Sequence, residues 1–413
     1  MKKQTLWCRN YSLLMLASML GSIGGIAGSY AMSFLVFDET GSTLATGLMS
    51  ALQIVPHFLV PILIAPWMDR MPRKPILVGG DLIGGVLYGL VAIYLHNFEF
   101  SYAGYLIFSL VINCVNALDS LAFNCIFPKV IPDGFEDKGF TVSAMLYPVL
   151  NVLMMPLAAL LMDTIGVANI LFIQSGMSIL AAVTENAIKI GEKLDFDEKK
   201  SGISLWIQDF KDGIRYLRGE RGLLNIYAYD AVTNGAYAGI GPILVAFFRT
   251  APGYSAQMYA FFSAAEFIGR SIGGVFRYRT NMKPEKRRKF VYSVQQFYNL
   301  MDAVLLWLPY PAMLVNRGIC GFLGINSATV RMSSIHRYLP EDYRARVNAF
   351  SEAAICIVGS VGSLLFGLLG ELLDYRTTMT IIACTSALAC YLTVGRHKKE
   401  LDEIYLYQSD IVS

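Results

Sequence analysis

The sequence has few charged residues and lacks two common enzyme motifs. Only 16% of its 413 residues are charged, whereas 55% are apolar, and the mean hydropathy is +0.48. An ordinary soluble domain carries about 25% charged residues, so this composition excludes one. The chain has no GxxxxGK motif for binding nucleoside triphosphates and no HExxH motif for binding zinc. We therefore expect a membrane protein that is not an enzyme and needs no cofactor.

The cysteines exclude two further classes of site. There are seven of them, an odd number, and none forms a C-x-x-C pair. Most lie within apolar runs, so the sequence favours neither a disulfide framework nor a metal site. The net charge of +3 is small and gives no reason to expect nucleic-acid binding.

Long apolar runs dominate the chain. Twelve of them, of roughly 18–25 residues, are each long enough to cross a bilayer as a helix. Several contain Gly or Pro, which membrane helices tolerate because neighbouring helices satisfy the backbone. The sequence therefore predicts an all-α membrane protein with twelve transmembrane helices. The predicted spans are 11–36, 43–66, 76–96, 102–127, 140–162, 167–188, 223–248, 256–276, 290–309, 311–331, 347–370 and 377–395.

The basic residues predict the orientation. If the N-terminus and every second loop face the cytoplasm, all but four of the 34 Lys and Arg residues lie on that side. Arg249 and Arg376 fall on the opposite side, and Arg270 and Arg317 fall within spans. This asymmetry follows the positive-inside rule. We therefore expect a multi-pass protein of the plasma (inner) membrane, with both termini in the cytoplasm and basic loops beside anionic lipid headgroups.

The chain contains two similar halves. Residues 129–135 align with 337–343, and the same offset places Asp69 against Arg277. This predicts two parallel six-helix repeats, at 1–188 and 223–396, joined by a linker at 189–222 and followed by a tail at 397–413. Apolar residues recur at helical spacing in the linker, opposite Lys and Arg. We interpret this pattern as an amphipathic helix on the inner leaflet, with a calmodulin-like target as the alternative.

A tight, charged loop separates the second and third spans. Residues 66–75 read PWMDRMPRKP and resemble the signature G-x-x-x-D-R-x-G-R-R/K of the Major Facilitator Superfamily. Ala65 and Pro72 stand where the family usually has Gly. The resemblance implies a gate that holds the two halves together when the outside is open. The charged positions that match are Asp69, Arg70, Arg73 and Lys74.

Two further segments resemble one branch of this superfamily. FKDGIRYLRGERGLL in the linker and YLPEDYRARVNAFS at 338–351 are similar to the branch that contains macrolide efflux proteins and the enterobactin exporter. Together with the signature loop and the twelve spans, the resemblance covers essentially the whole chain. It implies a secondary transporter in which helices 1, 4, 7 and 10 line a central cavity and helices 2, 5, 8 and 11 flank it.

Ionisable residues within the spans need a reason, because a charge at the bilayer centre costs ~3 kcal/mol. Glu266 and Arg270 stand four residues apart, so they share a helix face and can neutralise each other. They are candidates for proton coupling; the alternative is an ion pair that only fixes helix packing. We expect Asp302, at a similar depth, to hold Arg270 or a neighbour. Arg317, near a span end, is expected to be structural.

Asp230 and Asp119 are further candidates for proton coupling. Asp230 lies among tyrosines and asparagine in the seventh span, a mixture that suits an amphipathic or cationic organic substrate. A gating ion pair is the alternative for Asp230. Asp119 ends a polar stripe in the fourth span, which lacks the Arg that antiporters of the superfamily often carry. The candidates for the substrate cavity are Gln53, His57, Asn113, Asn116, Tyr227, Asp230, Asn234 and Tyr237.

These features predict a monomeric secondary transporter that works by alternating access. We expect it to export a small organic compound in exchange for protons. Two alternatives stay open from the sequence, namely a proton-coupled importer of a nutrient and a receptor or scaffold that has lost transport. No motif identifies the substrate.

Overall fold

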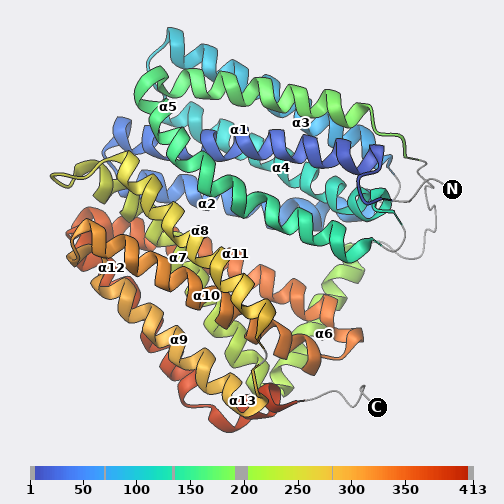
Figure 1. Ribbon diagram of the computed structural model, residues 1–413, viewed down its shortest axis with the longest axis vertical. Coiled ribbons are helices and arrows are strands. Elements are labelled where there is room, and N and C mark those ends of the chain that lie inside the picture. Colours follow the sequence, from blue (N-terminus) through green and yellow to red (C-terminus); the bar gives the residue numbers. More distant parts are fainter. Residues whose placement is uncertain (1–4, 69–70, 133–134, 191–202, 281, 408–413) are drawn as a thin grey trace. The chain divides into compact units, whose positions relative to one another are not determined.

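The computed structural model describes residues 5–68, 71–132, 135–190, 203–280 and 282–407, and every regular element in these ranges is helical (Figure 1). The chain divides into two compact units. The first comprises Met1–Gly41 and Val55–Ile203, and the second comprises Ser42–Ile54 and Ser204–Ser413.

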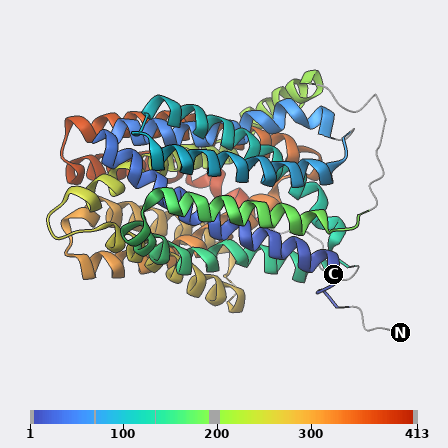
Figure 2. The same ribbon diagram turned by 90° about the horizontal axis from the view of Figure 1, so that it is seen from above.

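The first unit is a bundle of long helices. Its members pack as α1 on α5, α5 on α3 and α3 on α4, and Figure 2 shows them running along one direction. A cluster of buried apolar side chains, including Tyr11, Leu77 and Phe127, fills the space between α1, α3 and α4. The Tyr11 hydroxyl donates to the backbone oxygen of Gly139, 3.1 Å away. The helices that contribute residues to this unit are α1 (Arg9–Thr40), α2 (Thr43–Met68), α3 (Arg73–Asn97), α4 (Tyr102–Val130) and α5 (Glu136–Asn186).

The element α5 is two helices joined at one glycine. Gly166 has φ 81° and ψ 166°, a conformation that interrupts the helix and that glycine adopts without a steric penalty. The chain turns back there, so the two parts form a hairpin (Figure 1). The break lies between the predicted spans 140–162 and 167–188. The position of this turn is therefore as the sequence predicts.

The second unit holds the remaining long helices. Its strongest pairings are α7 with α11, α8 with α10 and α9 with α12. The first half of α2 also belongs to this unit, where the Ser363 hydroxyl of α11 donates to the Gly47 oxygen at 2.6 Å. Its helices are α6 (Ile203–Gly219), α7 (Arg221–Thr250), α8 (Ala256–Arg279), α9 (Pro284–Val304), α10 (Tyr310–Tyr338), α11 (Glu341–Leu372), α12 (Tyr375–Cys390) and α13 (Lys398–Leu406), with short turns η1 (Leu305–Trp307) and η2 (Tyr391–Gly395).

Eight of the described helices are long and apolar enough to cross a membrane by composition alone. One of these is α5, which contributes two spans because of its break at Gly166. The long helices that miss the criterion are α8, α9 and α10, and they carry charges within the predicted spans. Those charges are Glu266, Arg270, Asp302 and Arg317, and Arg331 is the last residue of the predicted span 311–331. Of the helices that form predicted spans, these three are therefore the ones that need a compensating network.

Large apolar side chains cover the outer surfaces of the helices. Leu90 is 57% exposed, Ile107 66% and Leu153 63%. A soluble monomer rarely exposes so much contiguous apolar surface, whereas lipid tails solvate it without cost. The exposed surface therefore fits a bilayer.

The helix α6 in the linker and the helix α13 in the tail both pack within the second unit. In α6, Leu217 is 1% exposed and Tyr216 stacks on Tyr343, with ring centres 4.3 Å apart. The linker thus forms the predicted helix, part of which packs on protein; its contact with the leaflet stays a prediction. In α13, Leu401 and Ile404 are at most 1% exposed. The segment predicted only as a tail therefore includes a docked helix.

Candidate functional site

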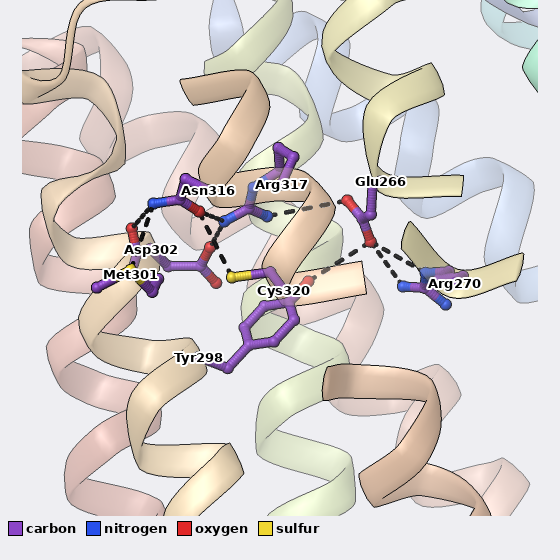
Figure 3. A network of polar contacts seen from close by, with 8 residues as sticks. All are labelled: Glu266, Arg270, Tyr298, Met301, Asp302, Asn316, Arg317 and Cys320. Atoms are coloured by element: carbon purple, nitrogen blue, oxygen red, sulfur yellow. Dashed lines mark hydrogen bonds and ion pairs between the residues drawn. The ribbon is translucent and has the colours of Figure 1, made fainter. Parts of the chain in front are cut away.

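A network of four charged side chains lies inside the second unit, between α8, α9 and α10 (Figure 3). Its centre is Arg317 of α10, which is only 2% exposed. The Arg317 Nη2 donates to Asp302 Oδ1 of α9, and its Nη1 lies 3.8 Å from Glu266 Oε2 of α8. One guanidinium thus joins two carboxylates from two other helices.

Glu266 has a second cationic partner on its own helix. Its Oε1 accepts hydrogen bonds from Arg270 Nη2 at 2.7 Å and Nε at 3.1 Å. The Tyr298 hydroxyl of α9 also lies 3.5 Å from this oxygen. The Glu266 side chain is 12% exposed and that of Arg270 is 43% exposed. Two carboxylates and two guanidiniums balance in charge, which is the condition for keeping them away from water.

Neutral groups complete the surroundings of Arg317. Its Nη2 donates to Asn316 Oδ1 at 3.3 Å, and Asn316 in turn donates to the Met301 backbone oxygen at 3.0 Å. The rings of Phe262 and Tyr298 lie 5.6 Å and 5.5 Å from the guanidinium carbon. These contacts hold the cation between aromatic faces, a favourable arrangement in a low-dielectric site.

Glycines bring α8 close enough to α10 for this network to form. A Cβ atom added at Gly269 would lie 2.1 Å from the Gly318 oxygen, and one at Gly321 would lie 2.2 Å from the Glu266 oxygen. Such short distances leave no room for a side chain at Gly269 or Gly321. The close approach of the two backbones places Glu266 beside Arg317, and small residues are the usual means to this end in membrane helices.

Residues 269–273 read GRSIG, which matches the letters of the GxSxG nucleophile motif. That motif requires a sharp turn between a strand and a helix. Ser271 instead lies within α8 and donates to the Phe267 oxygen at 2.9 Å. The geometry of a catalytic serine is therefore not present at this position.

Asp230 is paired with a cation that the sequence did not suggest. Its Oδ1 lies 3.1 Å from Arg331 Nη2, which joins α7 to α10. Asn234 donates to the Asp230 backbone oxygen at 2.8 Å. Tyr227 is 6% exposed within an apolar cluster, whereas Tyr237 is 56% exposed. Of the candidate tyrosines in α7, Tyr237 is the accessible one, and its charge interaction with Glu266 places it near the network.

Asp119 belongs to a group of acids in the first unit. It interacts electrostatically with Asp81 of α3, and Glu185 near the end of α5 interacts with both. Asp119 Oδ1 and Glu185 Oε2 are buried without a hydrogen-bond partner among the described residues. Asn113 donates to the Ser109 backbone oxygen at 2.7 Å. The sequence indicated Asp119, but it gave no sign that Glu185 would lie near it.

The remaining candidates are the predicted gate residues and the polar residues of α2 and α4. Asp69 and Arg70 of the predicted gate lie outside the described residues. Arg73 begins α3, and the Lys74 Nζ donates to the Asn186 oxygen at 2.7 Å. Gln53, His57 and Asn116 lie on α2 and α4, partly or fully exposed. In the described ranges, no group of three His, Cys, Asp or Glu residues is arranged to hold a metal ion.

Comparison with known proteins decides the family. The family model described as "Major Facilitator Superfamily" matches residues 11–297 and 298–403. The chain belongs to the Major Facilitator Superfamily. Macrolide efflux protein A of Streptococcus pyogenes is 20% identical over 404 residues, which cover 94% of this chain and 97% of that protein. The resemblance to the macrolide efflux branch is therefore confirmed.

Solved structures of transporters share the fold. A mutant of the nucleoside transporter NupG matches with a TM-score of 0.75 at 12% identity, covering 94% of this chain and all of the other. A POT family transporter in complex with 5-aminolevulinic acid matches with a TM-score of 0.68 at 12% identity, covering 95% and 96%. A bacterial homologue of the human lysosomal transporter Spinster gives 0.63 at 13% identity, covering 97% and 95%.

These matches confirm the predicted fold. The protein is an all-helical, multi-pass membrane protein with twelve spans in two six-helix repeats. Its family and fold are those of transporters of small molecules.

Proposed function

We propose that this protein is a proton-coupled exporter of a small organic compound that works by alternating access. The observation that carries the proposal is the network around Glu266, where one carboxylate contacts cations on two helices. Ionisable groups inside a membrane are costly and are by default functional. The macrolide efflux relative supports the outward direction.

Protonation of Glu266 would change how the helices of the second unit are held together. The contact between Glu266 and Arg317 links α8 to α10, whereas the bond between Arg317 and Asp302 links α10 to α9. A neutral Glu266 weakens the first link and leaves the second. It also releases Arg270, the more exposed of the two arginines. A proton that binds one conformation better than the other shifts their populations, which is the requirement for coupling.

The substrate class follows from the polar residues of α7 and α4. Tyr237 and Asn116 are exposed, and both belong to helices that line the cavity in this family. Aromatic and amide groups suit an amphipathic or cationic organic compound. Because a macrolide efflux protein is a relative of this chain, a macrolide is the first compound to test. The proposed orientation places both termini in the cytoplasm of a plasma membrane, with basic loops at anionic headgroups and a single chain as the working unit.

The test is transport in proteoliposomes with an imposed pH gradient. We expect a macrolide, or another member of a panel of amphipathic compounds, to accumulate against its gradient when protons flow the opposite way. Accumulation in the same direction as protons would favour an importer. A receptor or scaffold would be favoured if correctly inserted protein binds compounds but transports none of them with either gradient. Labelling of single cysteines introduced at Ser201 and Gln408 reads the orientation, and labelling from outside intact cells would contradict it.

A further inference from the structure

Three arginines converge at one end of the second unit. Arg277 lies in the last turn of α8, Arg287 in the first turn of α9 and Arg337 in the last turn of α10. All three belong to segments predicted to face the cytoplasm. They are close enough to repel one another: besides burial, the charge of Arg337 lowers the pKa of Arg277, and the charges of Arg337 and Arg277 lower that of Arg287. Arginine is the side chain that keeps its positive charge at physiological pH, so the cluster is a concentration of positive charge.

Ion pairs with described residues do not balance the charge of this cluster. None of the three arginines has an ion pair in the described ranges. The negative charge of Glu285 acts favourably on Arg287, but the Glu285 side chain is exposed. The next residue behaves differently, because Arg288 Nε donates to Asp402 Oδ1 at 2.5 Å. Among the described residues, Arg288 thus has an ion pair, whereas Arg277, Arg287 and Arg337 have none.

The donors of the cluster are also incompletely used. Arg287 Nε is buried with no hydrogen-bond partner among the described residues, and Nη1 makes only a 3.4 Å contact with the Tyr405 oxygen. Arg337 Nη2 reaches Ser334 Oγ at 3.5 Å, the limit of a hydrogen bond. Guanidinium groups bind phosphate oxygens through paired N–H donors, so several of them around one point form a suitable anion site.

We propose that Arg277, Arg287 and Arg337 form a binding site for the phosphate group of an anionic ligand. The phosphate belongs either to an anionic lipid of the inner leaflet or to a soluble phosphate compound. The ends of membrane helices lie at headgroup depth, which favours the lipid. Exposed Lys283 and Lys286, at the start of α9, add positive potential around the site. The phosphate site specifies where the proposed contact with lipid headgroups is made and so rests on the proposed function. Its test measures binding and not transport, so the site and the transport function can fail separately.

The experiment compares retention of lipid by purified protein. Wild type and the triple variant Arg277→Gln, Arg287→Gln, Arg337→Gln are purified in detergent with equal phosphatidylglycerol and phosphatidylcholine, and bound lipid is counted by native mass spectrometry. We expect wild type to retain phosphatidylglycerol selectively and the variant to bind it about tenfold more weakly, since each hydrogen bond to a charged group is lost. Arg279→Gln is the matched control for a change of charge in the same loop, and it should retain lipid like wild type.

A second arm separates the two sources of phosphate. Inorganic phosphate is added to protein that contains only phosphatidylcholine, and the midpoint of thermal unfolding is measured. A rise in wild type but not in the triple variant, without selective lipid retention, identifies a site for a soluble phosphate compound. If the triple variant does not fold, single substitutions of these arginines to Lys are used instead. Lys keeps the positive charge but lacks the paired N–H donors of the guanidinium group, so binding should weaken. The proposal is overturned if neither probe distinguishes wild type from these variants, or if Arg279→Gln loses binding to the same extent.

Discussion

Asp230 of α7 and Arg331 of α10 form an ion pair, with Oδ1 and Nη2 separated by 3.1 Å. Both side chains are largely buried, at 11% and 20% exposure. Tyr405 of the docked helix α13 lies near enough to interact electrostatically with both. The carboxylate therefore already has a partner within the protein. Of the two interpretations of Asp230, this favours a gating ion pair over a carboxylate that binds the substrate.

The variant Asp230→Asn tests this interpretation. It should lower the free energy of unfolding by about 3 kcal/mol, because Arg331 is left partly buried without its counter-charge. The double variant Asp230→Asn, Arg331→Gln should recover much of this loss, since no unpaired charge remains. Thermal unfolding in detergent measures both. If instead Asp230→Asn is as stable as wild type but no longer binds compound, Asp230 serves the substrate.

Replacement of Arg317 should lower the stability of the protein far more than replacement of Arg270. Arg317 is 2% exposed and serves two carboxylates, so Arg317→Met leaves Asp302 and Glu266 buried with one cation between them. A cost of about 3–5 kcal/mol is expected for breaking a buried pair. Arg270→Met removes a half-exposed side chain and should cost about 1 kcal/mol. Equal thermal stability of the two variants would contradict the central position of Arg317.

The predicted spans agree with the helices because length and apolar composition are local properties. The break in α5 is an example: Gly166 lies in the short gap between two predicted spans. The pairing of Glu266 with Arg270 was also predictable, because residues four apart on one helix are neighbours. Information of this kind is contained in a single segment, so no knowledge of the tertiary packing was needed.

The role of Arg317 was not predictable in the same way. Its partners come from two other helices, and it lies fifteen residues from Asp302 across the turn η1. From its place near a span end we expected a structural residue, and that role stays a prediction; the burial of its side chain at the centre of the network was not foreseen. The sequence did indicate that Asp302 would hold Arg270 or a neighbour, and that neighbour is Arg317. Arg331 and Glu185 likewise acquire their surroundings only when the helices pack.

The glycines between α8 and α10 provide a test of the packing that forms the network. Gly269→Ala places a methyl group where the Gly318 oxygen stands 2.1 Å away, so the helices must separate. We expect a loss of about 1–3 kcal/mol in stability, as for other overpacked sites. Gly274→Ala in the same helix is the control, because nothing lies within 4 Å of its added Cβ. Thermal unfolding should distinguish the two, and equal stability would mean that α8 and α10 are not in close contact.

The coupling role of Glu266 is tested by Glu266→Gln. The amide cannot change its charge, so Arg270 and Arg317 face a permanently neutral partner and the network no longer responds to protons. We expect exchange of compound across the membrane to continue, since no group of α7 or α4 is altered. Accumulation driven by a pH gradient should fall at least tenfold. Both are measured in proteoliposomes with a compound from the panel that wild type transports.

The control for this experiment is Glu99→Gln, which removes an exposed carboxylate in the loop between α3 and α4. It should leave both accumulation and exchange unchanged. A Glu266→Gln protein that still accumulates compound with the pH dependence of wild type would make Glu266 a packing residue. The proton site would then be sought in the first unit, where Asp119 and Glu185 have buried oxygens without partners among the described residues. Asp119→Asn and Glu185→Gln would in that case abolish accumulation, because a carboxylate that repels its acidic neighbours is the one that gains most from a proton.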